Sequence, residues 1–403
     1  MTRLGGLVVA LALVASACAA AVSGEAPVDS VEPANTSVGG PTDAANGAVL
    51  PFGPSALDDM FSNKLPTPLV DVDQIISGGP PPDGIPPIDD PTFVTVAEAN
   101  TYLTDREPVV ELDINGDARA YPVQVLIWHE IVNDTVGGVP VSVTYCPLCN
   151  SAVSYVREVR GVETTFGTSG RLFASALVMY DRETESLWTH FDGRAVVGVL
   201  TGDQLETIGS PLLAWEDFRE AHPEGKVLDR DTTGFRRDYG RNPYAGYDDA
   251  STQPFLFRGA LDDRARAKQR VVGVEIDGEA AAWSLDALSQ GDASATSVSL
   301  GGTDLVILWK AGQSTALEAS EIDAGRDVGS VGVFVPMLDG QALSFVASPD
   351  GFLDNESGST WNILGEAIAG PFVGAKLDRV AHLDTFWFAW STYRPGTELI
   401  EEL

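Results

Sequence analysis

Residues 128–150 read WHEIVNDTVGGVPVSVTYCPLCN, and this stretch decides the fold expected for the chain around it. Two runs rich in β-forming residues flank Gly137 and Gly138, a pair that suits the positive φ angles of a tight two-residue turn. The pattern therefore predicts a β-hairpin. With this turn, Val132 lies directly opposite Val143 on the facing strand.

In the same register His129 falls opposite Cys146, and directly opposed Cβ atoms lie about 4.5–5.5 Å apart. The hairpin thus predicts an imidazole beside the Cys-Pro-Leu-Cys turn of residues 146–149. Pro140 has no N–H group, so a bulge at this residue would shift the register by one position.

The composition limits the classes of partner. The chain has 403 residues and a formal net charge of -33 at pH 7. This length is sufficient for two domains with ample core. Nucleic acids and anionic membrane surfaces bind basic faces, so the acidity argues against both as partners.

The N-terminus has the features of a lipoprotein-type signal peptide over residues 1–18. Arg3 precedes an apolar run, residues 4–17, that is too short to span a bilayer comfortably. Small residues then lead to Cys18, which resembles the lipid-bearing cysteine of a bacterial lipobox. We therefore expect an exported protein anchored to the membrane by lipid on Cys18, at the outer face of the cell membrane or in the periplasm.

Ordinary signal cleavage near Ala17 or Ala20 is the alternative to this anchor. Residues 19–50 are rich in Ala, Ser, Pro, Gly, Asp and Glu and have no apolar periodicity. Such a composition is typical of a disordered tether.

The second half of the chain repeats the first. Three blocks recur in the same order: residues 271–283 echo residues 109–121, residues 354–361 echo residues 181–188, and residues 377–387 match residues 205–215 without a gap. We therefore expect a mainly β (α+β) fold, built as a tandem internal duplication with a few short helices. The first copy spans residues 51–235, a connecting segment spans 236–268, and the second copy spans 269–403.

The second copy lacks the cysteines of the first. Gly301 and Gly302 lead into a run that ends at Lys310, which takes the position of Cys146, and no cysteine follows. The second copy is therefore expected to keep the framework and to lack the chemistry.

One helix is expected in the first copy. Ser210 can serve as its N-cap, and Leu212, Trp215 and Phe218 then share one face. The helix is expected to end near Pro223.

Five runs of the sequence carry a resemblance to a known family: residues 78–86, 128–134, 144–150, 178–182 and 239–244. Together these runs resemble the domain-of-unknown-function 3179 family. The resemblance covers most of the chain after the tether and implies an exported bacterial setting. The family offers no settled activity, so the chemistry has to be argued from the residues.

The Cys-x-x-Cys pair, Cys146 and Cys149, allows three interpretations. A thioredoxin-like redox pair sits at a helix N-terminus, whose dipole lowers the thiol pKa; residues 150–156 are rich in β-formers and offer no such helix. A structural disulfide is possible in an exported compartment. A metal knuckle is the third interpretation, because Asn150 can adopt the positive φ that follows the second cysteine of such turns.

A metal ion needs more than two ligands. The hairpin register makes His129 the natural third, and Met179 or His190 is a candidate fourth. Met179 lies in an apolar run that also suits core packing, and His190 is expected at the surface or in a loop. His222 is expected to end a helix.

The favoured function is metal binding at Cys146, Cys149, His129 and Met179. Two thiolates with an imidazole suit copper or zinc and exclude magnesium or calcium as the natural ion. Copper, favoured slightly by the exported location, would admit a redox role. The alternatives are a thiol–disulfide oxidoreductase that uses Cys146 and Cys149, and a non-catalytic binding module with a structural disulfide. Whether the protein is an enzyme stays open.

Overall fold

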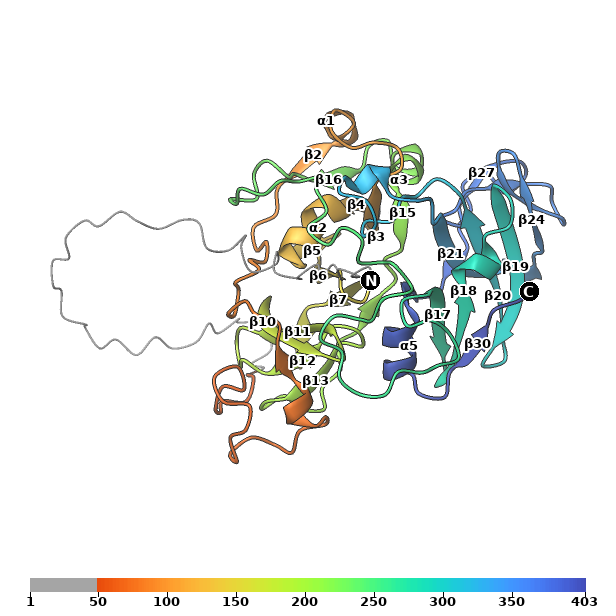
Figure 1. Ribbon diagram of the computed structural model, residues 1–403. Helices are drawn as coiled ribbons and strands as arrows, with labels where there is room; N and C mark the ends of the chain where they lie inside the picture. Colours follow the sequence, from red (N-terminus) through yellow and green to blue (C-terminus); the bar gives the residue numbers. More distant parts are fainter. Residues whose placement is uncertain (1–48) are drawn as a thin grey trace, which may run out of the picture. The chain divides into compact units, whose positions relative to one another are not determined.

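The computed structural model describes residues 49–403 (Figure 1). The predicted signal peptide with Cys18, and all of the predicted tether except its last two residues, lie outside the described residues. The described chain is mainly β, as predicted. Its five short α-helices are α1 (Val96–Ala99), α2 (Val123–His129), α3 (Trp215–Ala221), α4 (Leu285–Leu288) and α5 (Trp387–Tyr393).

Three sheets are formed by the first half of the chain. The first has the order β15 (Leu212–Ala214), β3 (Pro108–Ile114), β4 (Asp117–Pro122), β16 (Lys226–Leu228) and β2 (Phe93–Thr95). The second has the order β14 (Thr207–Ile208), β7 (Ser151–Val156), β6 (Val139–Cys146) and β5 (Ile131–Val136). The third has the order β1 (Ile76–Ser77), β10 (Phe166–Phe173), β11 (Ala176–Asp181), β12 (Leu187–Thr189) and β13 (Arg194–Val197).

The second half forms three further four-stranded sheets. One has the order β29 (His382–Phe386), β17 (Arg270–Ile276), β18 (Glu279–Ser284) and β30 (Glu398–Ile400). Another has the order β19 (Ala293–Leu300), β20 (Thr303–Lys310), β21 (Ser330–Val335) and β28 (Asp378–Arg379). The last has the order β24 (Phe345–Ser348), β25 (Gly351–Asp354), β26 (Thr360–Trp361) and β27 (Ala367–Ala369).

Short elements complete the described chain. Each half has one two-stranded ribbon, β8 (Glu158–Val159) with β9 (Val162–Glu163) and β22 (Met337–Leu338) with β23 (Gln341–Ala342). The 3₁₀ helices are η1 (Val72–Gln74) and η2 (Ile322–Ala324). No helix within residues 49–403 is long and apolar enough to cross a membrane.

The predicted hairpin is present in the predicted register. β5 and β6 pair antiparallel with Val132 opposite Val143, and Pro140 causes no shift. Gly137 and Gly138 form the turn with φ angles of 54° and 85°. A Cβ atom on Gly137 would lie 2.1 Å from the carbonyl oxygen of Ile114, so this position requires glycine for both its conformation and its close packing.

The expected helix starts later than predicted. Residues 212–214 form β15, which pairs antiparallel with β3, so the backbone is extended up to Ala214 and α3 begins at Trp215. Ser210 is therefore not the N-cap; that residue is Ala214. His222 ends the helix as its C-cap, as predicted. Sheet pairing has overridden the local helical pattern of residues 210–214.

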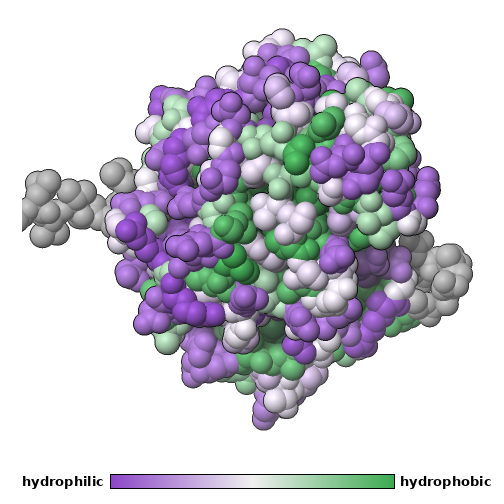
Figure 2. Space-filling model, turned by 90° about the vertical axis from the view of Figure 1, so that its right-hand side faces the viewer, coloured by the Kyte–Doolittle hydropathy of each residue, from purple (hydrophilic) through white to green (hydrophobic). Residues whose placement is uncertain are grey.

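The largest hydrophobic core joins the two halves of the chain. It contains both cysteines of the first half, Cys146 and Cys149, together with Phe386 and Trp387 of the second half. At the surface, Figure 2 shows hydrophilic residues spread over much of one face, with smaller apolar areas between them.

Candidate functional site

The two cysteines lie at either side of a turn between neighbouring strands. Cys146 is the last residue of β6 and pairs with Ser151, the first residue of β7. Asn150 has a φ of 48°, as the sequence predicted for the residue after the second cysteine. A strand follows the pair, so the helix dipole that activates thioredoxin-type thiols does not act here.

Both thiols are buried. Cys146 is 1% exposed and Cys149 is 0% exposed, and within the described residues both are free. The Sγ atom of Cys149 lies 2.9 Å from the hydroxyl oxygen of Ser151. These groups therefore sit inside the core and have no direct contact with solvent.

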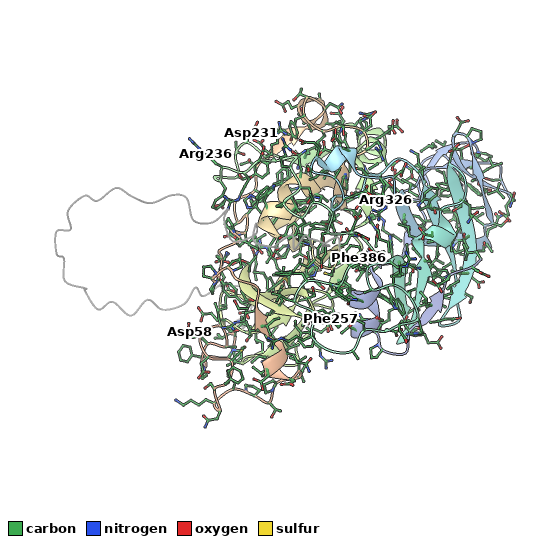
Figure 3. All side chains as sticks on the ribbon, viewed as in Figure 1. Asp58, Asp231, Arg236, Phe257, Arg326 and Phe386 are labelled. Carbon is green, nitrogen blue, oxygen red and sulfur yellow. The ribbon has the colours of Figure 1, made fainter. Side chains whose placement is uncertain are left out.

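The turn is held in place by later parts of the chain. The carbonyl oxygen of Cys149 accepts hydrogen bonds from the Thr385 hydroxyl at 2.7 Å and from the backbone N–H of Phe386 (labelled in Figure 3) at 3.2 Å. The Tyr247 hydroxyl donates to the carbonyl oxygen of Leu148 at 3.0 Å. The site is thus closed by the connecting segment and by β29 of the second half.

His190 is the histidine that lies with the cysteines. One ring nitrogen of His190 and the two sulfur atoms of Cys146 and Cys149 all lie within 4.8 Å of one another. His190 lies in the turn after β12, which agrees with the expected loop position, but it is fully buried, so the expected surface position is wrong. Within the part of the chain that the structure describes, neither ring nitrogen of His190 has a hydrogen-bond partner.

His129 does not take the position predicted for it. It is the last residue of α2, and the strand starts two residues later at Ile131, so it does not face Cys146 as a strand residue. Its Nδ1 atom lies 2.7 Å from the carbonyl oxygen of Pro86, and its Nε2 atom lies 2.7 Å from the hydroxyl of Tyr239. Both nitrogens are therefore already occupied by hydrogen bonds, and His129 is outside the group formed by the cysteines and His190.

His129 is misplaced in the prediction because residues 123–129 form helix α2, which the β-rich sequence pattern did not indicate. Pro122 stands at the N-cap of α2, and proline at the start of a run is a helix-start signal. Glu130 ends the helix with a φ of 60° before β5 begins. No comparable local signal marks His190, which follows β12 in a sheet that does not contain the strands of the cysteines. Its backbone N–H donates to the Leu177 carbonyl at 3.1 Å.

Met179 is buried in the same core as the cysteines. It lies on β11 opposite Trp188 of β12. This position is compatible with core packing and with a role beside the thiols, so its role as a ligand stays a prediction.

Burial sets the protonation states at the site. Burial lowers the pKa of His190 to about 3, so the ring is neutral near pH 7 and one nitrogen offers a lone pair. Burial raises the pKa of the Cys146 thiol, but hydrogen bonding from the Cys149 side chain and from backbone groups of Leu177, Cys149 and Leu148 outweighs burial, and the net pKa is lowered. Burial, followed by the interaction with Cys146, raises the pKa of Cys149 well above its usual range.

Glu130 is a further ionisable group beside the site that the sequence pattern did not single out. Burial raises its pKa well above the usual range, and the nearby Cys146 raises it further. Its positive φ is uncommon for a glutamate and is stabilised here by the helix end, where its N–H donates to the Leu126 carbonyl.

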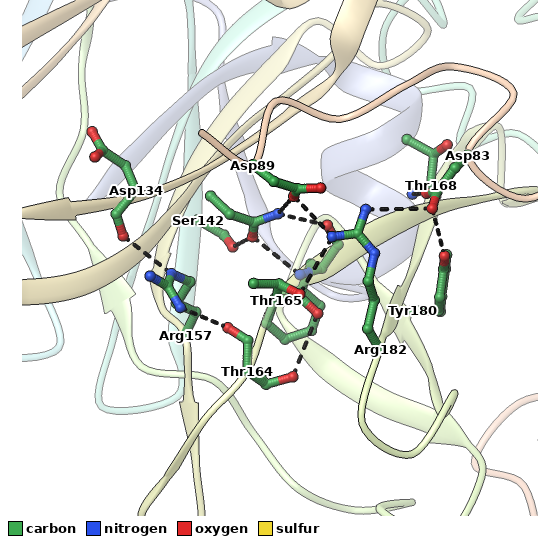
Figure 4. A network of polar contacts seen from close by, with 12 residues as sticks. Asp83, Asp89, Asp134, Ser142, Arg157, Thr164, Thr165, Thr168, Tyr180 and Arg182 are labelled. Atoms are coloured by element: carbon green, nitrogen blue, oxygen red, sulfur yellow. Dashed lines mark hydrogen bonds and ion pairs between the residues drawn. The ribbon is translucent and has the colours of Figure 1, made fainter. Parts of the chain in front are cut away.

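A network of polar contacts accounts for three of the sequence runs noted above (Figure 4). Arg182 forms ion pairs with Asp89 at 2.8 Å and with Asp83 at 3.3 Å. The Tyr180 hydroxyl donates to Asp83 at 2.7 Å, and the Asn133 amide donates to Asp89 at 2.7 Å. These contacts hold the proline-rich segment against β5 and β11, so the runs at residues 78–86, 128–134 and 178–182 position the scaffold.

The two histidines are expected to differ in their effect on stability. In metal-free protein, His190→Leu removes a buried imidazole that has no hydrogen-bond partner within residues 49–403. Burying such an unsatisfied polar group costs about 1–3 kcal/mol, so the free energy of unfolding of this variant should stay the same or rise. His129→Leu breaks two hydrogen bonds and should lower it by about 1–3 kcal/mol. Urea unfolding of both variants measures the difference, and a larger loss for His190→Leu than for His129→Leu would contradict the account.

The comparisons with known proteins identify a family. A family model described as "Protein of unknown function (DUF3179)" matches residues 82–397. Comparison with curated proteins and with solved structures gave no match. The matched region includes both cysteines, His190 and most of the second half, and the chain belongs to the DUF3179 family.

Proposed function

We propose that this protein is an exported, lipid-anchored metal-binding protein whose ligands are Cys146, Cys149 and His190. The observation that carries the proposal is the buried imidazole of His190, which has no hydrogen-bond partner within residues 49–403 and lies in range of two thiols. A buried polar group without a partner is costly, and a bound ion would remove that cost. His190 thus replaces His129 as the imidazole ligand.

The proposed ion is copper or zinc. Thiolate sulfur is a soft ligand that suits Cu(I) and zinc, and imidazole suits both metals. Zinc would take a closed tetrahedral site with a structural role. Cu(I) would accept the thioether of Met179 as a fourth ligand and admit electron transfer, and the proposed export favours copper because zinc knuckles are chiefly a feature of reducing compartments.

Metal reconstitution tests this function. Reduced protein loaded with zinc or Cu(I) should hold one ion per chain by elemental analysis, and Cys149→Ser and His190→Ala should each lose stoichiometric binding because each removes a ligand. His129→Ala is the matched control and should retain the ion. Full binding by both Cys149→Ser and His190→Ala would overturn the site.

A thiol–disulfide oxidoreductase is the second candidate. The observation in its favour is the unequal pair of thiols, with the pKa of Cys146 lowered and that of Cys149 raised, which suits an attacking thiolate and a resolving thiol. The burial of both sulfurs argues against access for a protein substrate. Reduction of insulin disulfides that needs both cysteines and persists in His190→Ala would favour this candidate over metal binding.

The proposed anchor is the lipid on Cys18. Cys18→Ser should release the protein from the membrane fraction or block its maturation, because the lipid-bearing side chain is removed. Mass spectrometry of the mature N-terminus provides the measurement. An unmodified terminus beyond Cys18 would rule out the anchor.

We also propose that the chain is a tandem duplication. The sheet order β15–β3–β4–β16 has its counterpart in β29–β17–β18–β30, with the same parallel and antiparallel pairings. Asp181 and Asp354 each accept hydrogen bonds from two backbone N–H groups and from a tryptophan, Trp188 and Trp361, both at 2.9 Å.

Lys310 occupies the position of Cys146 in this proposal. Lys310 ends β20 and pairs with the first residue of β21, as Cys146 ends β6 and pairs with the first residue of β7. The second half would then have kept the scaffold without the ligands. Experimental coordinates in which the two sets of sheets fail to superpose with Lys310 on Cys146 would refute the duplication.

A further inference from the structure

A second group of metal-ligating side chains lies at the contact between the two halves. One ligand atom each from Asp113, His222 and Glu366 lies within 4.8 Å of the others. Asp113 is on β3 and His222 is the C-cap of α3, both in the first half, whereas Glu366 directly precedes β27 in the second half. Three segments far apart in the sequence therefore converge here.

Glu111 supplies an independent observation at the same place. It is fully buried, and its Oε1 atom points at the group, 3.6 Å from Nε2 of His222. Among the residues that the structure describes, Glu111 Oε1, Asp113 Oδ1 and His222 Nε2 are buried and make no hydrogen bond; Glu111 Oε1 and His222 Nε2 face each other and form an ion pair only when the imidazole is protonated. Because buried polar groups are almost always paired, this arrangement is unusual for a neutral imidazole.

The neighbouring cations leave these atoms unsatisfied. Arg379 pairs with the other oxygen of Glu111, Oε2, at 2.5 Å. Lys376 lies between the remaining acids, with Nζ 3.0 Å from Asp113 Oδ2 and 2.6 Å from Glu366 Oε1. The side chain of Lys376 is 57% exposed, so it can turn into solvent at little cost and free two carboxylates.

We propose that Asp113, His222 and Glu366 bind a divalent transition-metal ion, with Glu111 facing the imidazole. Carboxylate oxygens with one imidazole nitrogen form a harder set of ligands than the thiols, which suits Mn²⁺ and disfavours Cu(I). His222 also lines a cavity of about 570 Å³, together with Asp117 and Lys226. The ion would join β3 and α3 of the first half to residues 366–379 of the second.

Mn²⁺ titration of the full chain, followed by electron paramagnetic resonance, tests this site. Mn²⁺ is a suitable probe because thiolates are poor ligands for it. One ion per chain is expected, and Asp113→Asn and His222→Ala should each weaken binding at least about tenfold. Lys376→Gln should tighten binding, because it removes the ammonium group that competes for two of the carboxylates.

The outcome is separable from that of the thiol site. Cys149→Ser and His190→Ala should bind Mn²⁺ as the unmodified protein does, whatever their effect on copper or zinc. Should Asp113→Asn or His222→Ala fail to fold, Lys376→Gln, on the surface, still reports on the site through its tighter binding. Absence of saturable Mn²⁺ binding in both the unmodified protein and Lys376→Gln, or equal Mn²⁺ affinity in folded His222→Ala, would overturn the proposal.

Discussion

The carbonyl oxygen of Cys149 is the point on which the arrangement of the site depends. It accepts hydrogen bonds from Thr385 and Phe386 of the second half, while its own turn joins β6 to β7 of the first half. Because these bonds lie in the shared core, the turn is kept in a dry, fixed position. The second half thus closes the site although it has no cysteine of its own.

Burial without hydrogen-bond partners is the common feature of both proposed metal sites. Within residues 49–403, the ring nitrogens of His190 make no hydrogen bond at the thiol site. At the second site the same holds for Glu111 Oε1 and His222 Nε2. The donors differ in kind, two sulfurs at the first site and carboxylates at the second. The thiol site would therefore select a softer metal ion, and the carboxylate site would select a harder one.

The sequence pattern was sufficient for the hairpin of β5 and β6 and for the turn that holds the cysteines. The hairpin register around Gly137, the positive φ of Asn150 and the strand after the cysteines all follow from local turn and strand preferences, and the structure has each of them. The predicted position of His129 was wrong because the strand pattern was extended from Ile131 back toward the N-terminus, into residues that form α2.

Long-range pairing accounts for what the sequence could not provide. His190 lies near the cysteines although it follows a strand of a different sheet, and Glu366 meets Asp113 only because the two halves pack together. Neither contact leaves a periodic or spacing signal in the chain. The scaffold role of Asp83 and Arg182 likewise becomes visible only once residues nearly a hundred positions apart are seen in contact.

X-ray absorption spectroscopy of the zinc- or Cu(I)-loaded protein tests the central claim most directly. The account predicts sulfur neighbours at about 2.3 Å and an imidazole nitrogen at about 2.0 Å from the ion. The imidazole signal should disappear in His190→Ala and persist in His129→Ala. A spectrum with only oxygen and nitrogen neighbours, or an imidazole signal unchanged in His190→Ala, would contradict it.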